Sequence, residues 1–172
     1  MIPTTSILLP LYLYPTPGAW HWVTEALSAH PSLPFTIIIN PHSGPGPLNT
    51  YPEHDYIAGI TNLTTFDNVR LLGYVATKYM AKSITAVEQE VETYKYWTTH
   101  TPTALPIHGI FFDEAVHEWT ASTSSYMTQL ATHAHALNLS VMLNPGTIAS
   151  EQFFEIADAV VMVEDAYNIM LL

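Results

Sequence analysis

The sequence predicts an α/β protein of the (β/α)8 TIM-barrel type, with about six of the eight strand–helix units inside its 172 residues. Short apolar runs alternate with segments whose apolar residues recur at helical spacing, which is the pattern of βαβ units. Polar residues cluster at the end of each apolar run. No G-x-G-x-x-G or Walker A sequence follows any run, so the usual support for a nucleotide-binding open sheet is missing.

The first half of the chain contains three expected strands and two expected helices. The strands are apolar on both faces, as parallel strands covered by helices must be. The first helix carries Trp20, Val23 and Leu27 on one stripe. In chain order we expect strand 7–14, helix 19–30, strand 35–40, helix 56–66 and strand 69–77.

The second half repeats this alternation. We expect helix 84–97, strand 107–112, helix 126–137, strand 140–143, one or two helical turns over 151–156, strand 159–163 and the start of a helix at 166–172. All of these elements are expected to form one domain over residues 1–172. Because a barrel of this class takes about 250 residues, we expect the domain to be incomplete at its carboxyl end.

The distribution of polar residues distinguishes a barrel from an open sheet. An open sheet places its site in one crevice, whereas a barrel places it on the rim where the carboxyl ends of all strands meet. Polar residues at the ends of all six strands favour the barrel. Six strands without closure leave the first and last strand with open edges, so we expect that an oligomer is possible through them.

Two acidic pairs are the main chemical signal: Asp113-Glu114 and Glu164-Asp165 each follow a strongly apolar strand. Carboxylates are costly to desolvate, so a pair at the buried end of a strand usually has a reason. Two carboxylates across a cleft are the equipment of glycoside hydrolysis. The alternative is that these acids cap the helices that follow, where a carboxylate complements the helix dipole.

Strand alternation predicts which of these acids share a cavity. If Phe111 points into the barrel, so does Asp113, and if Val160 and Met162 point inward, so does Glu164. Alternate strands of a barrel contribute to the same layer of inward side chains. Asp113 and Glu164, on the fourth and sixth strands, are therefore expected to face one cavity.

Amides and aromatic residues at strand ends are candidate sugar-binding groups. Asn40 and Asn144 each precede a proline, and they either bind a sugar hydroxyl or acetamide or are ordinary turn residues. Aromatic rings on the rim either stack on sugar faces or pack under loops. The aromatic candidates are Tyr14, Tyr74, Tyr79 and Trp119.

The composition excludes several classes of partner. Four Lys and Arg against fifteen Asp and Glu give a net charge of −11, which leaves little with which to bind phosphates, so nucleic acid is not an expected partner. There are no cysteines, and the nine histidines show no metal-ligand spacing, so we expect neither a metal nor another cofactor. No run reaches 18 apolar residues, so no membrane span is expected.

A series of short motifs, in order from about residue 7 to residue 167, resembles the spherulin-4 family. The series begins with Leu-Pro-Leu-Tyr-Leu-Tyr-Pro at 9–15 and Pro-Gly-Ala-Trp at 17–20. It continues with Ile-Asn-Pro at 39–41, Ser-Gly-Pro-Gly at 43–46, Leu-Gly-Tyr-Val at 72–75, Gly-Ile-Phe-Phe-Asp-Glu at 109–114, Leu-Asn-Pro-Gly at 143–146 and Val-Glu-Asp at 163–165.

The resemblance implies a (β/α)8 barrel and a glycoside hydrolase that cuts galactosaminogalactan within its α-1,4-N-acetylgalactosamine stretches. It places the acidic functional residues of the family on Asp113, Glu114 and Glu164. It also implies an extracellular protein, although the sequence lacks the basic region and cleavage site of a signal peptide.

From the residues and the resemblance together, we predict hydrolysis of an amino-sugar polysaccharide. Asp113, Glu114 and Glu164 are the predicted catalytic residues. The predicted substrate-binding residues are Tyr14, Asn40, Tyr74, Asn144 and Asp165. The alternative is a carbohydrate-binding or developmental structural protein on the same scaffold that has no turnover.

Overall fold

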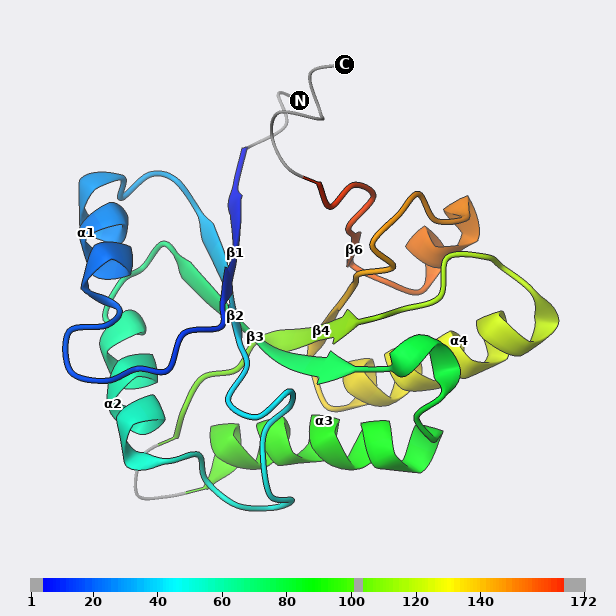
Figure 1. Cartoon of the computed structure of the whole chain (residues 1–172), viewed down its shortest axis with the longest axis horizontal. Coiled ribbons are helices and arrows are strands. Elements are labelled where there is room, and N and C mark those ends of the chain that lie inside the picture. Colours follow the sequence, from blue (N-terminus) through cyan, green and yellow to red (C-terminus); the bar gives the residue numbers. More distant parts are fainter. Residues whose placement is uncertain (1–4, 101–103, 166–172) are drawn as a thin grey trace.

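Six strands form one parallel sheet in the chain order β1-β2-β3-β4-β5-β6, in a computed structural model that describes residues 5–100 and 104–165. The sheet is curved, and its helices are arranged around the outer face (Figure 1). The strands are β1 (Ile7–Leu11), β2 (Phe35–Ile39), β3 (Val69–Ala76), β4 (Gly109–Asp113), β5 (Ser140–Leu143) and β6 (Ala159–Val160). This is a half-barrel, which confirms the predicted class.

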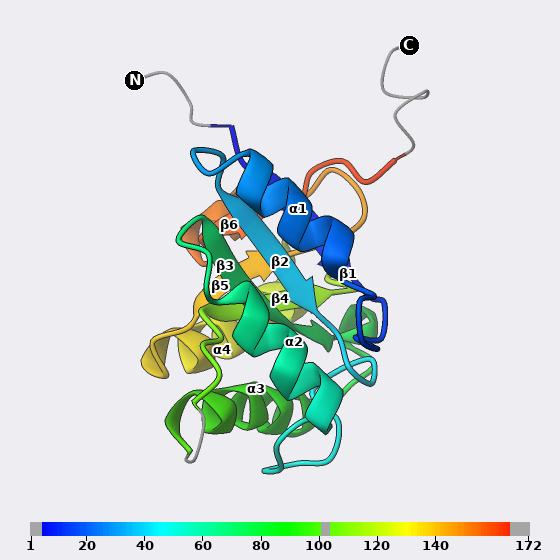
Figure 2. The same ribbon diagram turned by 90° about the vertical axis from the view of Figure 1, so that its left-hand side faces the viewer.

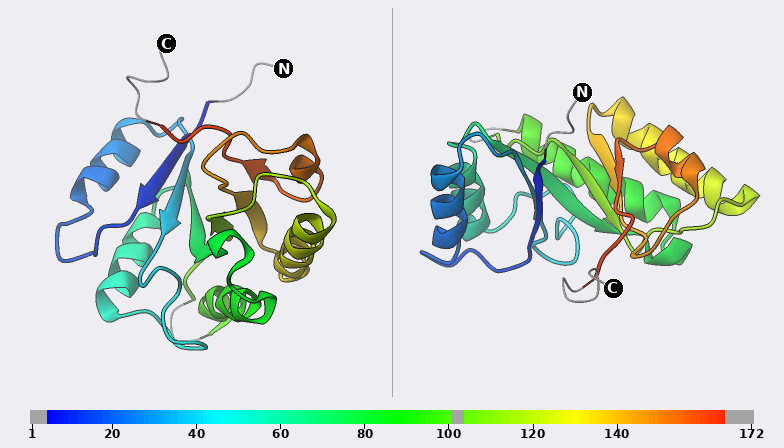
Figure 3. Two further views of the ribbon diagram at one scale, coloured as in Figure 1. Left: turned by 45° about the vertical axis from the view of Figure 1, so that its right-hand side comes forward. Right: turned by 90° about the horizontal axis from the view of Figure 1, so that it is seen from above.

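Four α-helices and two short 3-10 helices connect the strands. In Figure 2, α1 and α2 lie on the same side of the sheet, and Figure 3 shows the helices following the outside of the curve. The helices are α1 (His21–Ala29), α2 (His54–Leu63), α3 (Ile84–Thr99) and α4 (Ala121–Ala136), and the 3-10 helices are η1 (Lys78–Met80) and η2 (Glu151–Glu155). In the described part of the chain, the inner face of the sheet carries no helix.

Alternation along the strands divides the apolar side chains between two faces. The outer-facing set, which includes Ile37, Ile39 and Ile110, packs with the helices into the main core. The inner-facing set forms a smaller cluster on the concave side, with Met142 and Val161 packed against it. The members of this inner cluster are Ile38, Leu72, Tyr74, Ala76 and Phe111.

The helix α3 packs closely on the sheet because β3 has a glycine at the point of contact. A Cβ atom at Gly73 would lie 2.6 Å from the ring of Tyr94. The buried Tyr94 hydroxyl donates to the carbonyl oxygen of Ile39 at 3.1 Å. This contact ties α3 to both β2 and β3, and it fixes the helix under the loops that follow these strands.

Most expected elements are confirmed, with three main differences. β1 ends at Leu11 instead of residue 14, β6 is two residues long instead of five, and α4 begins at Ala121 instead of residue 126. The early start of α4 comes from a capping box, in which Thr120 and Thr123 each bond the backbone N–H of the other. The first turn of α4 is polar, so apolar periodicity does not detect it. The expected helix at 166–172 lies outside the described residues.

We predict that Thr120→Ala lowers the free energy of unfolding by about 1 kcal/mol, because it removes the side-chain cap of α4. Urea denaturation followed by circular dichroism measures this loss. Thr128→Ala, at an exposed position within the same helix, is the matched control and is expected to leave stability unchanged or slightly raised. Equal stability of the two variants would contradict the capping role.

Candidate active site

The amide of Asn144 joins two carboxylates at the carboxyl ends of the strands. Asn144 directly follows β5 and is 6% exposed. Its Nδ2 group donates to Oδ1 of Asp113 at 2.8 Å and to Oε2 of Glu164 at 2.8 Å. Its Oδ1 accepts from the backbone N–H of Gly146 at 3.1 Å. Because Gly146 takes the oxygen, both amide hydrogens are directed at the two acids.

Two tyrosines enclose Asp113 on its other side. The hydroxyl of Tyr74 donates to Oδ2 of Asp113 at 2.7 Å, so each oxygen of this carboxylate has a donor. The ring of Tyr12 meets the ring of Tyr74 edge to face, with 5.6 Å between centroids. Burial, and then the hydrogen bond to Asp113, raises the pKa of Tyr74 well above its usual value. Burial, followed by the charges of Asp113 and Glu164, raises the pKa of Tyr12 in the same direction.

The backbone at the end of β4 is held in an unusual conformation by the residues that follow β3. Glu114 has a φ of 51°, a left-handed conformation that costs a non-glycine residue about 1–3 kcal/mol. Its carbonyl oxygen accepts from the hydroxyl of Thr77 at 2.7 Å and from the N–H of Tyr79 at 2.7 Å. The N–H of the fully buried Thr77 also donates to the carbonyl oxygen of Asp113 at 2.9 Å. Thr77 thus positions the backbone of both acids.

One group of predicted site residues is brought together by hydrogen bonds. Its members are Asp113, Asn144, Glu164 and Tyr74. Glu114 lines a cavity of about 620 Å³ with Tyr74, directly beside this cluster.

The other predicted substrate-binding residues lie apart or serve the loops. The Tyr14 hydroxyl donates to Oε2 of Glu53 at 2.7 Å, away from the cluster. Oδ1 of Asn40 accepts from the N–H of Gly44 at 2.9 Å, the turn role that was the alternative for this residue. Asp165 is exposed and follows Glu164.

The two remaining aromatic candidates are not part of the cluster either. Tyr79 is 61% exposed in the η1 turn. Trp119 packs against Phe153 with 4.9 Å between ring centroids and belongs to the edge of the main core.

The expected alternation of β6 is wrong, although Glu164 still shares a hydrogen-bond partner with Asp113. Val160 and Met162 pack against the outer core, whereas Val161 packs against the inner cluster. Strict alternation would therefore turn Glu164 outward. β6 ends at Val160, so the irregular chain beyond it is free of strand geometry and brings Glu164 to Asn144.

Two residues of the cluster were not singled out in the sequence. Tyr12 is not among the predicted residues, whereas Tyr14, which has the same parity along the first strand, is. Leu11 is buried in the main core, so its neighbour Tyr12 lies on the opposite, inner face of the sheet. The role of Thr77 rests on contacts between two strands, and nothing in its local sequence indicates it.

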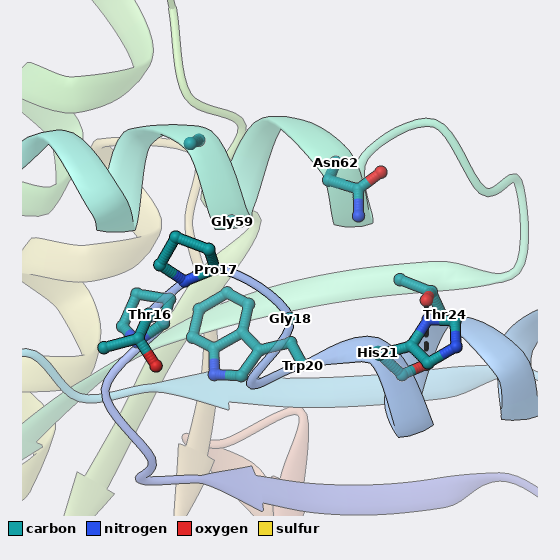
Figure 4. Close-up of a pocket in the computed structure, with 10 residues that line it drawn as sticks. Thr16, Pro17, Gly18, Trp20, His21, Thr24, Gly59 and Asn62 are labelled. Carbon is teal, nitrogen blue, oxygen red and sulfur yellow. Dashed lines mark hydrogen bonds between the residues drawn. The ribbon is translucent and has the colours of Figure 1, made fainter.

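The described residues offer two further observations on candidate sites. No group of three or more His, Cys, Asp or Glu in residues 5–100 and 104–165 is arranged to hold a metal ion. A cavity of about 240 Å³ lies between the β1–α1 loop and α2 (Figure 4). Its wall includes Trp20, whose indole N–H already donates to the carbonyl oxygen of Leu13 at 2.9 Å. None of its lining residues belongs to the acidic cluster.

No helix among the described residues is both long enough and apolar enough to cross a membrane.

The fold and the cluster together define a barrel-type α/β protein with a paired carboxylate site at the carboxyl ends of its strands. The chain belongs to spherulation-specific family 4, Spherulin4, whose family model matches residues 6–171. This match confirms the resemblance found in the sequence.

Two relatives illustrate the extent of the similarity. The chain is 34% identical over 165 residues to Spherulin-4 of Physarum polycephalum, covering 94% of this chain and 45% of that protein. The crystal structure of Aspergillus clavatus Sph3 in complex with GalNAc is similar with a TM-score of 0.91 and 38% identity, covering 98% of this chain and 69% of that chain. The chain therefore spans less than half the length of the curated relative.

We predict that Asp113→Asn lowers the pKa of Tyr74 toward its ordinary value, because it removes the negative charge that disfavours the ionised phenol. Burial remains, so the pKa stays above the usual value of about 10. A pH titration of the tyrosine Cζ signals by NMR measures the change. Tyr126 is the control, since burial raises its pKa to about 12 without a carboxylate partner. An unchanged Tyr74 titration would contradict the assigned contact.

Proposed function

We propose that this chain carries the catalytic site of a glycoside hydrolase that acts on an amino-sugar polysaccharide. Asp113 and Glu164 are the main carboxylate pair, and Glu114 assists them. The observation that carries this proposal is the shared amide of Asn144, which brings carboxylates from two strands to one point on the rim. A carboxylate pair of this kind supplies the acid and the nucleophile or base of glycosidic cleavage.

The separation of the two carboxylates supports a retaining reaction. Both facing oxygens lie 2.8 Å from the same nitrogen atom, so they lie no farther apart than twice that distance. Retaining glycosidases hold their carboxyl groups about 5–5.5 Å apart, whereas inverting enzymes leave roughly 6.5–9.5 Å for a water molecule. In the retaining scheme one carboxylate attacks the anomeric carbon, while the other group, as the protonated carboxylic acid, gives its proton to the leaving oxygen.

The similarity to Sph3, a protein crystallised with GalNAc, supports N-acetylgalactosamine as a unit of the substrate. The polymer that we propose is galactosaminogalactan, cut within its α-1,4-N-acetylgalactosamine stretches. A partly deacetylated polymer of this kind is cationic, and the net charge of −11 suits its attraction to the protein. Raising the salt concentration is therefore expected to weaken binding, and salt-independent binding would count against the attraction.

The second candidate function is carbohydrate binding without turnover, as in a developmental structural protein. The similarity to Spherulin-4 fits this function as well, and the chain covers only part of both relatives. The two functions differ in what the acids do. A binding protein keeps its affinity for the sugar when Asp113, Glu114 and Glu164 are all replaced, and it releases no product.

We predict that Glu164→Ala lowers kcat on galactosaminogalactan by at least about 10²-fold, because it removes one member of the carboxylate pair. A reducing-end assay of product release measures the loss in kcat. The free energy of unfolding is expected to change by less than about 1 kcal/mol, since Glu164 is exposed. Glu155→Ala, at an exposed acidic residue of η2, is the control for general charge effects. Full activity in a folded Glu164→Ala protein would refute the assignment.

We also predict that the first product of hydrolysis keeps the α configuration, as the short carboxylate separation requires. Proton NMR during the first minutes of the reaction distinguishes the α product from the β product before the anomers equilibrate. A β anomer formed first would show that a water molecule attacks directly and that the carboxylates move apart when substrate binds.

A further inference from the structure

The position of Glu164 depends on a segment that strand pairing holds over a very short stretch. β6 contains two residues, which pair with the last two residues of β5. Just beyond β6, the N–H of Val161 donates to the carbonyl oxygen of Leu143 at 2.8 Å. Glu164 follows three residues later, where its Oε2 accepts from Asn144 at 2.8 Å. So short a paired stretch fixes little of the chain, and other contacts must hold the segment that carries Glu164.

Asp158, the residue directly before β6, supplies such a contact to β5. Its Oδ2 accepts from the backbone N–H of Val141 at 2.7 Å, and its own N–H donates to the carbonyl oxygen of Val141 at 2.9 Å. Val141 is 1% exposed, and a buried backbone N–H needs an acceptor. Asp158 therefore bonds both backbone groups of Val141 and extends the pairing of the two strands by one residue.

The same carboxylate oxygen connects β6 to α4. Nε2 of His135, in the last turn of α4, lies 2.9 Å from Oδ2 of Asp158. The bond from Val141, followed by the bond from His135, lowers the pKa of Asp158 below its usual value, so its carboxylate is ionised at neutral pH. Because an ionised carboxylate only accepts, Nε2 of His135 carries the donated hydrogen. One oxygen atom thus links β5, β6 and α4.

Two carboxylates hold the segment from Asp158 to Glu164 against β5. Asp158 bonds Val141 near the amino end of β5, and Glu164 bonds Asn144 directly after its carboxyl end. Between these two bonds β5 advances by three residues, whereas the segment advances by six. The segment is therefore longer than the strand that it follows, and its few backbone bonds do not remove the excess. Without the Asp158 bonds, β6 is free to shift along β5 and to carry Glu164 away from Asn144.

We propose that Asp158 is a positioning residue of the candidate active site, which fixes the register of β6 and thereby places Glu164 beside Asn144. Its bonds lie toward the amino end of β5, away from the acidic cluster, so it acts through β6 and not by touching a substrate. The inference rests on the proposed function only for the role of Glu164 in cleavage. The effect of Asp158 on the position of Glu164 is independent of that role.

The side-chain amide of Asn144 reports the position of Glu164 without turnover. One hydrogen of this amide bonds Glu164, so the Glu164→Ala protein defines the NMR shift of that proton when the bond is absent. Asp158→Ala is expected to move the proton signal at least half of the way toward this reference. Asp158→Asn keeps an oxygen that accepts from Val141, and we expect it to restore most of the wild-type shift.

Two further variants complete the NMR series. Asp67→Ala, at an exposed aspartate in the turn before β3, is the matched control and is expected to leave the Asn144 signal in place. His135→Ala removes only the bond to α4, and we expect it to move the signal in the same direction by a smaller amount. It carries the test if Asp158→Ala does not fold, and an unchanged signal in His135→Ala then overturns the proposal.

Kinetics on the proposed substrate give a second readout. Asp158→Ala is expected to lower kcat by about tenfold or more and to change KM by less than about twofold, because a displaced catalytic group weakens the transition state more than substrate binding. A purely structural role predicts no such division between kcat and KM. Thr120→Ala, which removes the cap at the other end of α4, is the control for lost stability and is expected to keep the wild-type kcat.

The positioning role is overturned if a folded Asp158→Ala protein keeps the wild-type Asn144 signal, or if Asp67→Ala moves that signal equally. Failure of the proposed hydrolysis gives a different result. In that case the wild-type chain releases no product from galactosaminogalactan, yet Asp158→Ala still moves the Asn144 signal, and the positioning role stands. Conversely, wild-type hydrolysis with an unchanged signal and unchanged kcat in Asp158→Ala overturns the positioning role and leaves the proposed hydrolysis in place.

Discussion

Parallel pairing of all six strands in chain order is the constraint on which the rest of this structure depends. Because every strand runs in the same direction, every carboxyl end opens on one rim of the curved sheet. Asp113 at the end of β4 and Asn144 directly after β5 thereby meet within hydrogen-bond distance, and the irregular chain beyond β6 brings Glu164 to the same amide. In the described part of the chain, the helices occupy the outer face of the sheet.

The rim holds two carboxylates close together by means of neutral donors. Two negative charges at short range repel each other. Here hydrogen bonds from neutral groups hold the two acids together: the Asn144 amide donates to both, and the Tyr74 hydroxyl donates to the second oxygen of Asp113. Neutral donors orient the two acids without placing a fixed charge between them.

Local sequence patterns predicted most of the fold and about half of the residues in the candidate active site. Apolar runs located the strands, and acids directly after two of those runs located Asp113 and Glu164. Two failures depend on contacts between distant segments. The two-residue length of β6 ended the alternation assumed for Glu164, and the loop after β1 carried Tyr14 away while Tyr12 stayed. The third is local: a capping box between Thr120 and Thr123 extends α4 through a polar first turn, which apolar periodicity does not detect.

The strained turn after β3 connects the acidic cluster to the neighbouring cavity. Thr77 bonds the backbone of both acids of β4, and the three left-handed residues that follow it line the neighbouring cavity or lead to Lys82. A relaxed turn would free the carbonyl oxygen of Glu114 and withdraw Lys78 from the cavity wall at the same time. The same turn therefore does two things: it holds the backbone of the acids that we propose as catalytic, and it places Lys78 in the wall of the cavity beside them.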